Sequence, residues 1–421
     1  MTVVRSAAEL VDALATADDI EVDGTISGSP SIELRPGVRL HGGTLRFGAR
    51  GIRLTSGNQL EDVTVLVPDT EVAIGTAAAD VGRVALRNVR TRGQVLLTGG
   101  AGHIDVDGLA IASADVRGRE ERPHGFGVDV LQGAFTLWSR QVSSSLTATL
   151  TGISVGTADL PVRGSGVFVG GPVEVDVLRT GPVYTDGGID EGTPDLISGG
   201  VYVITGASVQ QVINDGPVTT HGANDMALGN WATVGTWTAR APVTTHGPSG
   251  IGYVSFGTLN QLDLRAPVAT HGTGARGFNV YDGYLASARF QSITTYGDGA
   301  VGVAVRKDLP VLEIVDDITT SGGAGQSLVR GVQVHLRAIA VSVEAGGRIG
   351  RLTVGGALRT TGDDVVTLDV EGAIDELAAG EIAAFGAGSL PVRVSGAGSV
   401  AGLDSVTETG PVDRKAQGNG S

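Results

Sequence analysis

The chain has 421 residues and a formal net charge of −15, with 67 glycines and no cysteine. The excess of negative charge argues against nucleic acid or an anionic membrane as a partner, and the lack of cysteine excludes disulfides and thiolate metal sites. The first residues, MTVVRSAAEL, contain no apolar signal segment, and no stretch is apolar enough to cross a bilayer, so we expect a cytoplasmic protein unless a leader precedes this sequence.

A short helix is predicted at the N-terminus. Ser6 followed three residues later by Glu9 forms a capping box, and Leu10, Val11 and Leu14 give the following turns one apolar face. Short alternating strands broken by Gly and Pro follow, from Ile20 onwards. We interpret residues 6–17 as a helix that caps the first coil of a strand-rich solenoid.

The opening of the chain resembles a known superfamily. The helix followed by Leu34-Arg-Pro-Gly-Val-Arg-Leu-His-Gly-Gly43 is similar to the start of pectate-lyase-like right-handed parallel β-helix proteins. The resemblance covers only this first part of the chain and implies a fold rather than a reaction. Many proteins of that superfamily are carbohydrate-active enzymes, and the resemblance implies a saccharide as partner.

A repeat with a fixed period dominates the middle of the chain. Pro217-Val-Thr-Thr-His-Gly222 recurs from Pro242 and, with one change, from Pro267, and weaker copies end at Gly297 and Gly322, each 25 residues after the last. Such a period, with strand-like units punctuated by Gly, predicts an all-β, single-stranded right-handed parallel β-helix. About 15 residues are inserted between Gly322 and the next matching turn at Gly362. We predict one domain over residues 1–412 and a disordered polar tail over 413–421.

Alternation along each strand divides the repeat into inward and outward columns. The positions expected to face the core are Val218, Val243, Val268, Ile293 and Ile318, and the threonines two residues later, whose hydroxyls should pair along their own ladder. The outward column before each turn contains Asp186, His221, His246, His271 and Tyr296. Stacked imidazoles repel when protonated, so we expect these histidines to be largely neutral near pH 7. The alternative is a ladder kept only for packing.

Three turns after this column carry extra residues, at 115–124, 157–164 and 188–198, and should gather on one edge of the solenoid. The last loop is expected to bring carboxylates towards an Asp186–His221 pair and the turn at Asn224–Asp225. The candidate catalytic residues are therefore Asp186, Asp190, Glu191, Asp195, His221 and Asp225. For any one of these carboxylates, a solvated acidic loop is the alternative.

A second outward column lies nine residues after each repeating glycine and contains Trp231, Phe256, Tyr281 and Arg306. Aromatic faces at coil spacing suit an extended saccharide, or else contact a second subunit in a homodimer or homotrimer. The candidate substrate-binding residues are Asn224, Trp231, His246, Tyr253, His271, Tyr281 and Arg306.

These patterns lead to two hypotheses. The first is an enzyme that cleaves or transfers a glycosidic bond of an oligo- or polysaccharide with paired carboxylates, or a polysaccharide lyase. The second is a non-catalytic β-helix that acts as a scaffold or binding protein. No cofactor and no metal site is expected in either case.

Overall fold

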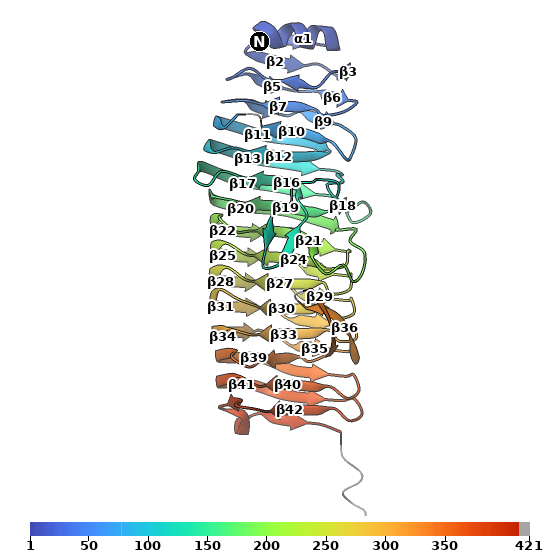
Figure 1. Cartoon of the computed structure of the whole chain (residues 1–421), viewed down its shortest axis with the longest axis vertical. Coiled ribbons are helices and arrows are strands. Elements are labelled where there is room, and N and C mark those ends of the chain that lie inside the picture. The colour runs from blue at the N-terminus through green and yellow to red at the C-terminus, as the bar shows by residue number, and fades with distance from the viewer. Residues whose placement is uncertain (77, 330, 412–421) are drawn as a thin grey trace, which may run out of the picture.

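The computed structural model describes residues 1–76, 78–329 and 331–411. Parallel strands stack coil upon coil along one axis, so the protein is a parallel β-helix (Figure 1). Helix α1 (Ala7–Thr16) covers the first coil, and the Ser6 Oγ accepts the Glu9 N–H at 3.2 Å as the capping box predicts. The last coil ends in β44 (Thr407–Thr409), and the predicted tail at 413–421 lies outside the described residues.

Each coil of the repeat region contributes three strands, and equivalent strands pair in parallel with the 25-residue register read from the sequence. Val218 pairs with Val243, and Val243 pairs with Val268. The strands of this region are β22 (Ser208–Asn214), β23 (Val218–Thr220), β24 (Asp225–Asn230), β25 (Thr233–Ala239), β26 (Val243–Thr245), β27 (Ile251–Ser255), β28 (Thr258–Leu264), β29 (Val268–Thr270), β30 (Arg276–Val280), β31 (Tyr284–Phe290), β32 (Ile293–Thr295), β33 (Val301–Val305), β34 (Asp308–Ile314) and β35 (Ile318–Thr320).

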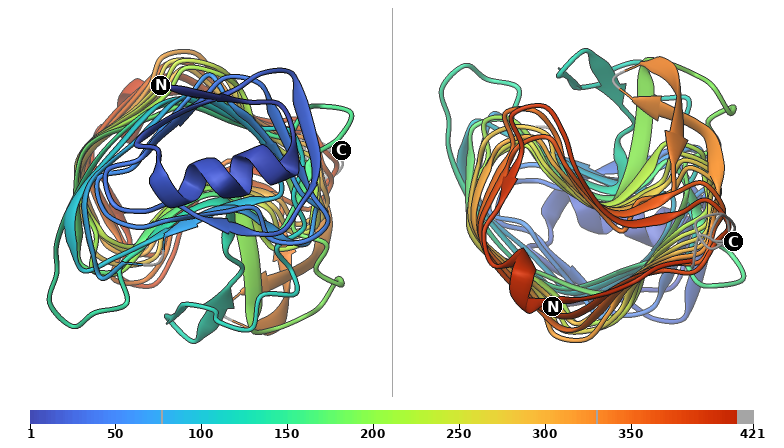
Figure 2. Two further views of the ribbon diagram at one scale, coloured as in Figure 1. Left: turned by 90° about the horizontal axis from the view of Figure 1, so that it is seen from above. Right: turned by 90° about the horizontal axis from the view of Figure 1, so that it is seen from below.

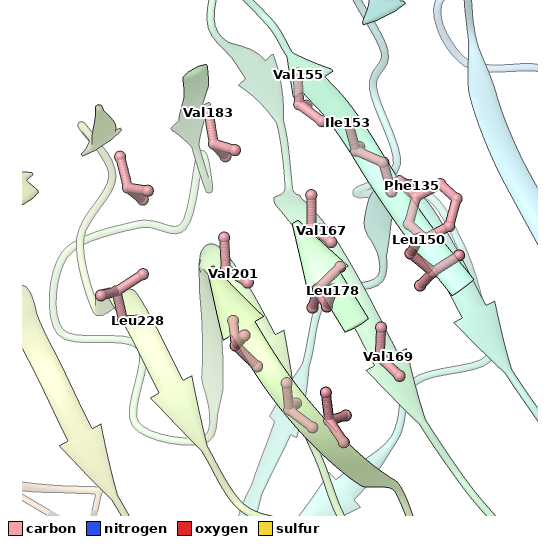
Figure 3. Packing of buried hydrophobic residues seen from close by; sticks show 14 of the residues in the cluster. Phe135, Leu150, Ile153, Val155, Val167, Val169, Leu178, Val183, Val201 and Leu228 are labelled. Carbon is pink, nitrogen blue, oxygen red and sulfur yellow. The ribbon is translucent and has the colours of Figure 1, made fainter. Parts of the chain in front are cut away.

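The interior is a continuous apolar column. One hydrophobic cluster runs from Val4 to Ile382, and the predicted inward residues Val218, Val243 and Val268 are all 0% exposed. Figure 3 shows the same kind of packing in earlier coils, where Val167 and Leu178 are among the side chains that fill the interior. Burying one such side chain contributes about 1.5–3 kcal/mol, so the stacked columns account for much of the stability of the solenoid.

The threonine column is buried as predicted, but its hydroxyls do not pair with one another. The Thr295 hydroxyl donates to the Ala300 carbonyl at 3.2 Å, and the Thr320 hydroxyl to the Ala338 carbonyl at 3.0 Å. The hydroxyls earlier in the column have no hydrogen-bond partner among the described residues; they belong to Thr185, Thr220, Thr245 and Thr270. A hydroxyl ladder was therefore the wrong expectation for this column.

The second sheet, which contains β24, β27, β30 and β33, has a covered outer face. Phe278 and Val280 belong to the interior cluster, while Val254 and Tyr281 belong to a separate cluster on the outer side. The insertions cover this face. They form the hairpin of β14 (His124–Gly125) and β15 (Val128–Val130), the loop before β21 (Leu196–Val203), and the hairpin of β36 (Ala324–Val329) and β37 (Val332–Arg337). Figure 2 shows both hairpins projecting from the same side of the solenoid.

Within the described part of the chain, no helix has the length and apolarity that crossing a membrane requires.

Candidate ligand-binding site

Three segments that are far apart in the sequence meet over the second sheet. The first hairpin joins the loop before β21, because the Asp129 N–H donates to the Asp195 carbonyl at 2.8 Å. The β36–β37 hairpin folds back over the coils, where the Leu328 N–H donates to Ser249 Oγ at 2.9 Å. Gly331, with φ +76°, lies so close to the loop that a Cβ there would stand 3.0 Å from the Pro194 carbonyl oxygen. The three insertions thus enclose one stretch of the sheet.

A pocket of about 230 Å³ lies beneath them. Its floor comes from the sheet and its walls from the insertions. The lining residues are Phe126, Val128, Pro194, Ile197, Asn224, Met226, Trp231, Ser249, Ile251, Phe256, Tyr281, Asp282, Leu328 and Gly331. Most of these side chains are apolar, as is typical of small-molecule sites, and the volume is below the roughly 300–1,000 Å³ of pockets for drug-sized ligands.

The aromatic column forms one side of the pocket, and its rings pack against one another. Phe256 and Tyr281 stack with centroids 5.0 Å apart and planes 17° apart, and Trp231 packs edge-on against Phe256 at 5.3 Å. The Arg306 guanidinium covers the far side of the Tyr281 ring at 4.8 Å and pairs with Glu344. Because ring faces are already in contact, the column does not offer the row of open faces that an extended saccharide requires. The expected row of sugar-stacking platforms was therefore wrong.

Phe126 is a solvent-exposed part of the pocket lining. It lies at the tip of the first hairpin with a positive φ of 51° and packs against Phe256 at 4.5 Å and against Trp231 at 5.2 Å. Its side chain is still 49% exposed, whereas Trp231 and Tyr281 are only 4% exposed. The column thus faces away from the core as predicted, but the insertions shield it from solvent.

Most polar groups of the pocket already have partners that position its walls; the exception is the indole N–H of Trp231, which is buried without an acceptor among the described residues. The Asn224 amide nitrogen donates to the Thr193 carbonyl at 2.9 Å and so holds the loop, while Ser249 Oγ holds the β36–β37 hairpin. Asp282 forms an ion pair with Lys307 at 3.2 Å. A ligand in this pocket therefore meets mainly apolar surface.

The structure does not assemble the predicted catalytic set. The register places Asp186 beside His221 in adjacent coils, but the Asp186 carboxylate forms its ion pair with Arg163 and accepts the Gly188 N–H at 2.9 Å. The loop carboxylates Asp190, Glu191 and Asp195 are exposed. They are not part of the pocket lining, to which their loop contributes Pro194 instead.

Asp225 is the one predicted catalytic residue with an unusual environment. It is fully buried, and its carboxylate accepts hydrogen bonds from the Ser198 hydroxyl, from the Gly222 N–H at 2.8 Å and from the Gly187 N–H at 3.3 Å. Burial raises the pKa of Asp225 from 3.8 to about 6; the three hydrogen bonds oppose this shift, and the nearby Asp186 charge adds to it. The carboxylate links the turns at Gly187 and Gly222 of adjacent coils to Ser198 in strand β21, which is a structural role.

This environment predicts a pH-dependent stability. Because the folded-state pKa exceeds the unfolded value, the contribution of Asp225 is fully present below about pH 4 and is lost as the pH rises through 6, by on the order of 3 kcal/mol. Asp225→Asn removes the titration. Its oxygen accepts the two glycine N–H groups, and its amide donates to Ser198 Oγ. Denaturation from pH 4 to 7 should show the parent losing stability relative to this variant; parallel profiles would contradict the assignment.

The histidine column lies on the edge of the solenoid, outside the pocket lining. His221, His246 and His271 stack at 4.8 Å with planes within 10°, and Tyr296 continues the stack. Partial burial, with the neighbouring imidazoles, lowers the pKa of His246, as predicted for stacked rings. Among the described residues, no group of His, Asp or Glu side chains is arranged to hold a metal ion.

Tyr253 was also expected to line the site, but it points into the solenoid. It is 0% exposed and packs against Trp237 and Phe278 in the interior cluster. The side of the sheet that Tyr253 faces was predicted wrongly because the alternation of inward and outward side chains is broken within β27. Ile251 and Val254 face outwards, while Tyr253 and Ser255, which lie between and after them, do not line the pocket.

Sequence reasoning missed Phe126, Met226, Ile251 and Leu328 as lining residues. The only sequence signal for the two hairpins was the extra length of the insertions, and length alone does not show which residues a hairpin contacts.

No protein-family model, curated protein or solved structure matches the chain.

Proposed function

We propose that this protein binds a small, mainly apolar molecule in the pocket beneath its three insertions. The observation that carries the proposal is a largely apolar pocket built by three separate departures from a regular repeat. Ordering long insertions costs conformational entropy, and a coil does not need them to complete its own core. The use of Asn224 and Ser249 to fix the walls supports a preformed site.

The size and lining of the pocket suit a single ring rather than a chain of sugars. Its volume is small, most of its polar groups are engaged and the faces of its aromatic rings are covered. A sugar ring needs polar partners for its hydroxyls, whereas a saturated or aromatic hydrocarbon ring needs only apolar contact.

Tryptophan fluorescence and thermal shift test this proposal. Cyclohexanol should raise the melting temperature and change the emission of Trp231, while methyl glucoside should have little effect. Ile251→Phe fills part of the pocket and should weaken cyclohexanol binding at least tenfold. The control, Val311→Phe, alters an exposed residue on the larger sheet and should leave binding unchanged. Stronger binding of the glucoside than of cyclohexanol would restore the saccharide hypothesis.

Glycoside cleavage is a second candidate, and one observation favours it. A glycosidase uses one protonated carboxyl as proton donor and one ionised carboxylate. Asp225 has a raised pKa and the nearby Asp186 charge contributes to it, so the two resemble such a pair. The buried position of Asp225 opposes this function because a substrate would have to displace Gly187 and Gly222. Incubation with an oligosaccharide panel and product detection by mass would decide, since turnover that is lost in Asp186→Asn supports an enzyme.

A further inference from the structure

A buried arginine lies behind one wall of the pocket. Arg276, the first residue of β30, is 2% exposed, and its Nη2 donates to Ser327 Oγ of the β36–β37 hairpin at 2.8 Å. Ser327 in turn donates to the Gly274 carbonyl at 2.8 Å. The arginine therefore points outwards from the sheet and is covered by the hairpin.

This guanidinium has no counter-charge. Among the described residues no ion pair joins Arg276 to a carboxylate, and its Nη1 is buried without a hydrogen-bond acceptor. Arginine remains protonated even when buried, and an unpaired buried charge is destabilising. The ion pairs of other arginines in this region, such as Arg289 with Asp263 and Arg306 with Glu344, show how unusual Arg276 is.

A second unpartnered polar side chain lies on the same face of the same strand. Asn279 is 0% exposed, and neither its amide nitrogen nor its amide oxygen has a hydrogen-bond partner in the described structure. Phe278 and Val280 on either side of it point inwards, and its register partner Val254 belongs to the outer cluster, so Asn279 faces outwards.

These two residues adjoin the pocket. Arg276 pairs in register with Ile251, and Ser327 is followed by Leu328; Ile251 and Leu328 both line the pocket. Tyr281, two residues beyond Asn279, lines it as well. Arg276 thus lies next to two lining residues, Ile251 in the adjacent strand and Leu328 in the hairpin that covers it.

We propose that Arg276 binds the carboxylate of the pocket's ligand, which makes that ligand a small apolar carboxylic acid. The inference rests on the proposed function. A carboxylate carries one negative charge, which matches a single guanidinium, and its acceptor-only oxygens suit the planar N–H fork. The ring occupies the pocket, and the carboxylate displaces the Leu328 side chain to reach Arg276.

Calorimetric titration with cyclohexanecarboxylate and its neutral isostere cyclohexanecarboxamide tests the proposal. The parent should bind the carboxylate about 10- to 100-fold more tightly than the amide, as expected for hydrogen bonds to a charged group. Arg276→Met should abolish this preference while leaving amide binding intact. Without ligand it should melt no lower than the parent, since an apolar chain replaces an unpaired charge.

Two further variants keep the test decisive. Arg276→Lys retains the charge but not the planar fork, so it should keep only part of the preference for carboxylate over amide. This variant can be measured even if Arg276→Met fails to fold. Arg351→Met removes an exposed arginine that pairs with Glu376 and should behave like the parent. Equal affinity of the parent for carboxylate and amide, or a preference that survives in both Arg276 variants, would overturn the proposal.

Acetate separates this inference from the proposed function. If acetate stabilises the parent but not Arg276→Met while neither ring compound binds, the carboxylate site stands with a free anion as its ligand, and the pocket's function fails. If both ring compounds bind equally well and acetate has no effect, the pocket's function stands and the carboxylate site fails.

Discussion

Val243→Asp should prevent stable folding. Val243 is 0% exposed in the middle of the interior column, between Val218 and Val268 of the adjacent coils. An aspartate there buries a carboxylate with no partner, at a cost of several kcal/mol, which is a large fraction of the stability of an ordinary domain. Circular dichroism and thermal denaturation of the purified variant measure the effect.

The matched control is Thr244→Asp, one residue further along the same strand. Thr244 is half-buried on the outer side of β26, where a carboxylate can remain solvated. It should melt close to the parent, and a parental melting temperature for Val243→Asp would show that the strand faces the other way.

Asp225→Ala should be the second strongly destabilising change. It leaves the Ser198 hydroxyl and the Gly187 and Gly222 N–H groups buried without an acceptor. With its pKa of about 6, the Asp225 carboxyl is mostly protonated at pH 5, so the substitution removes hydrogen bonds rather than a buried charge. Each unsatisfied group costs about 1–3 kcal/mol, and we expect a net loss of about 2–4 kcal/mol near pH 5. Chemical denaturation at that pH measures it.

Asp190→Ala provides the comparison, because this loop carboxylate is exposed and should change the free energy of unfolding by less than about 0.5 kcal/mol. If the two alanine variants unfold alike, Asp225 does not join the turns as described.

The repeat was sufficient to predict the fold because a β-helix is specified locally. The 25-residue spacing sets which strands pair, and the two-residue period sets which side chains face inwards, as at Val218 and Val243. The capping box likewise predicts helix α1 from residues only three apart.

The site could be predicted only in part because it depends on contacts that do not repeat. The sequence placed Trp231, Phe256 and Tyr281 in one outward column, and they do line the pocket. Nothing in the repeat shows that Phe126 and Leu328 fold over that column. These contacts join segments separated by up to 130 residues, and each depends on how one insertion folds.

The carboxylates were misjudged for a related reason. Alternation along a strand predicts that Asp186 faces outwards, and the repeat places Asp225 in the turn after His221, but neither predicts which donors surround these carboxylates. Arg163 pairs with Asp186 across adjacent coils, and donors from two turns and from strand β21 converge on Asp225. A pKa shift of this kind follows from burial, which the composition of a turn does not reveal.

A crystal structure with cyclohexanecarboxylate would show directly whether the pocket beneath the three insertions is a ligand site. We expect the ring between Phe256, Met226 and Ile251, next to Phe126, with Leu328 displaced and the carboxylate against Arg276. A pocket that stays closed around unchanged side chains at saturating ligand, or a ring bound along the histidine column instead, would contradict this expectation.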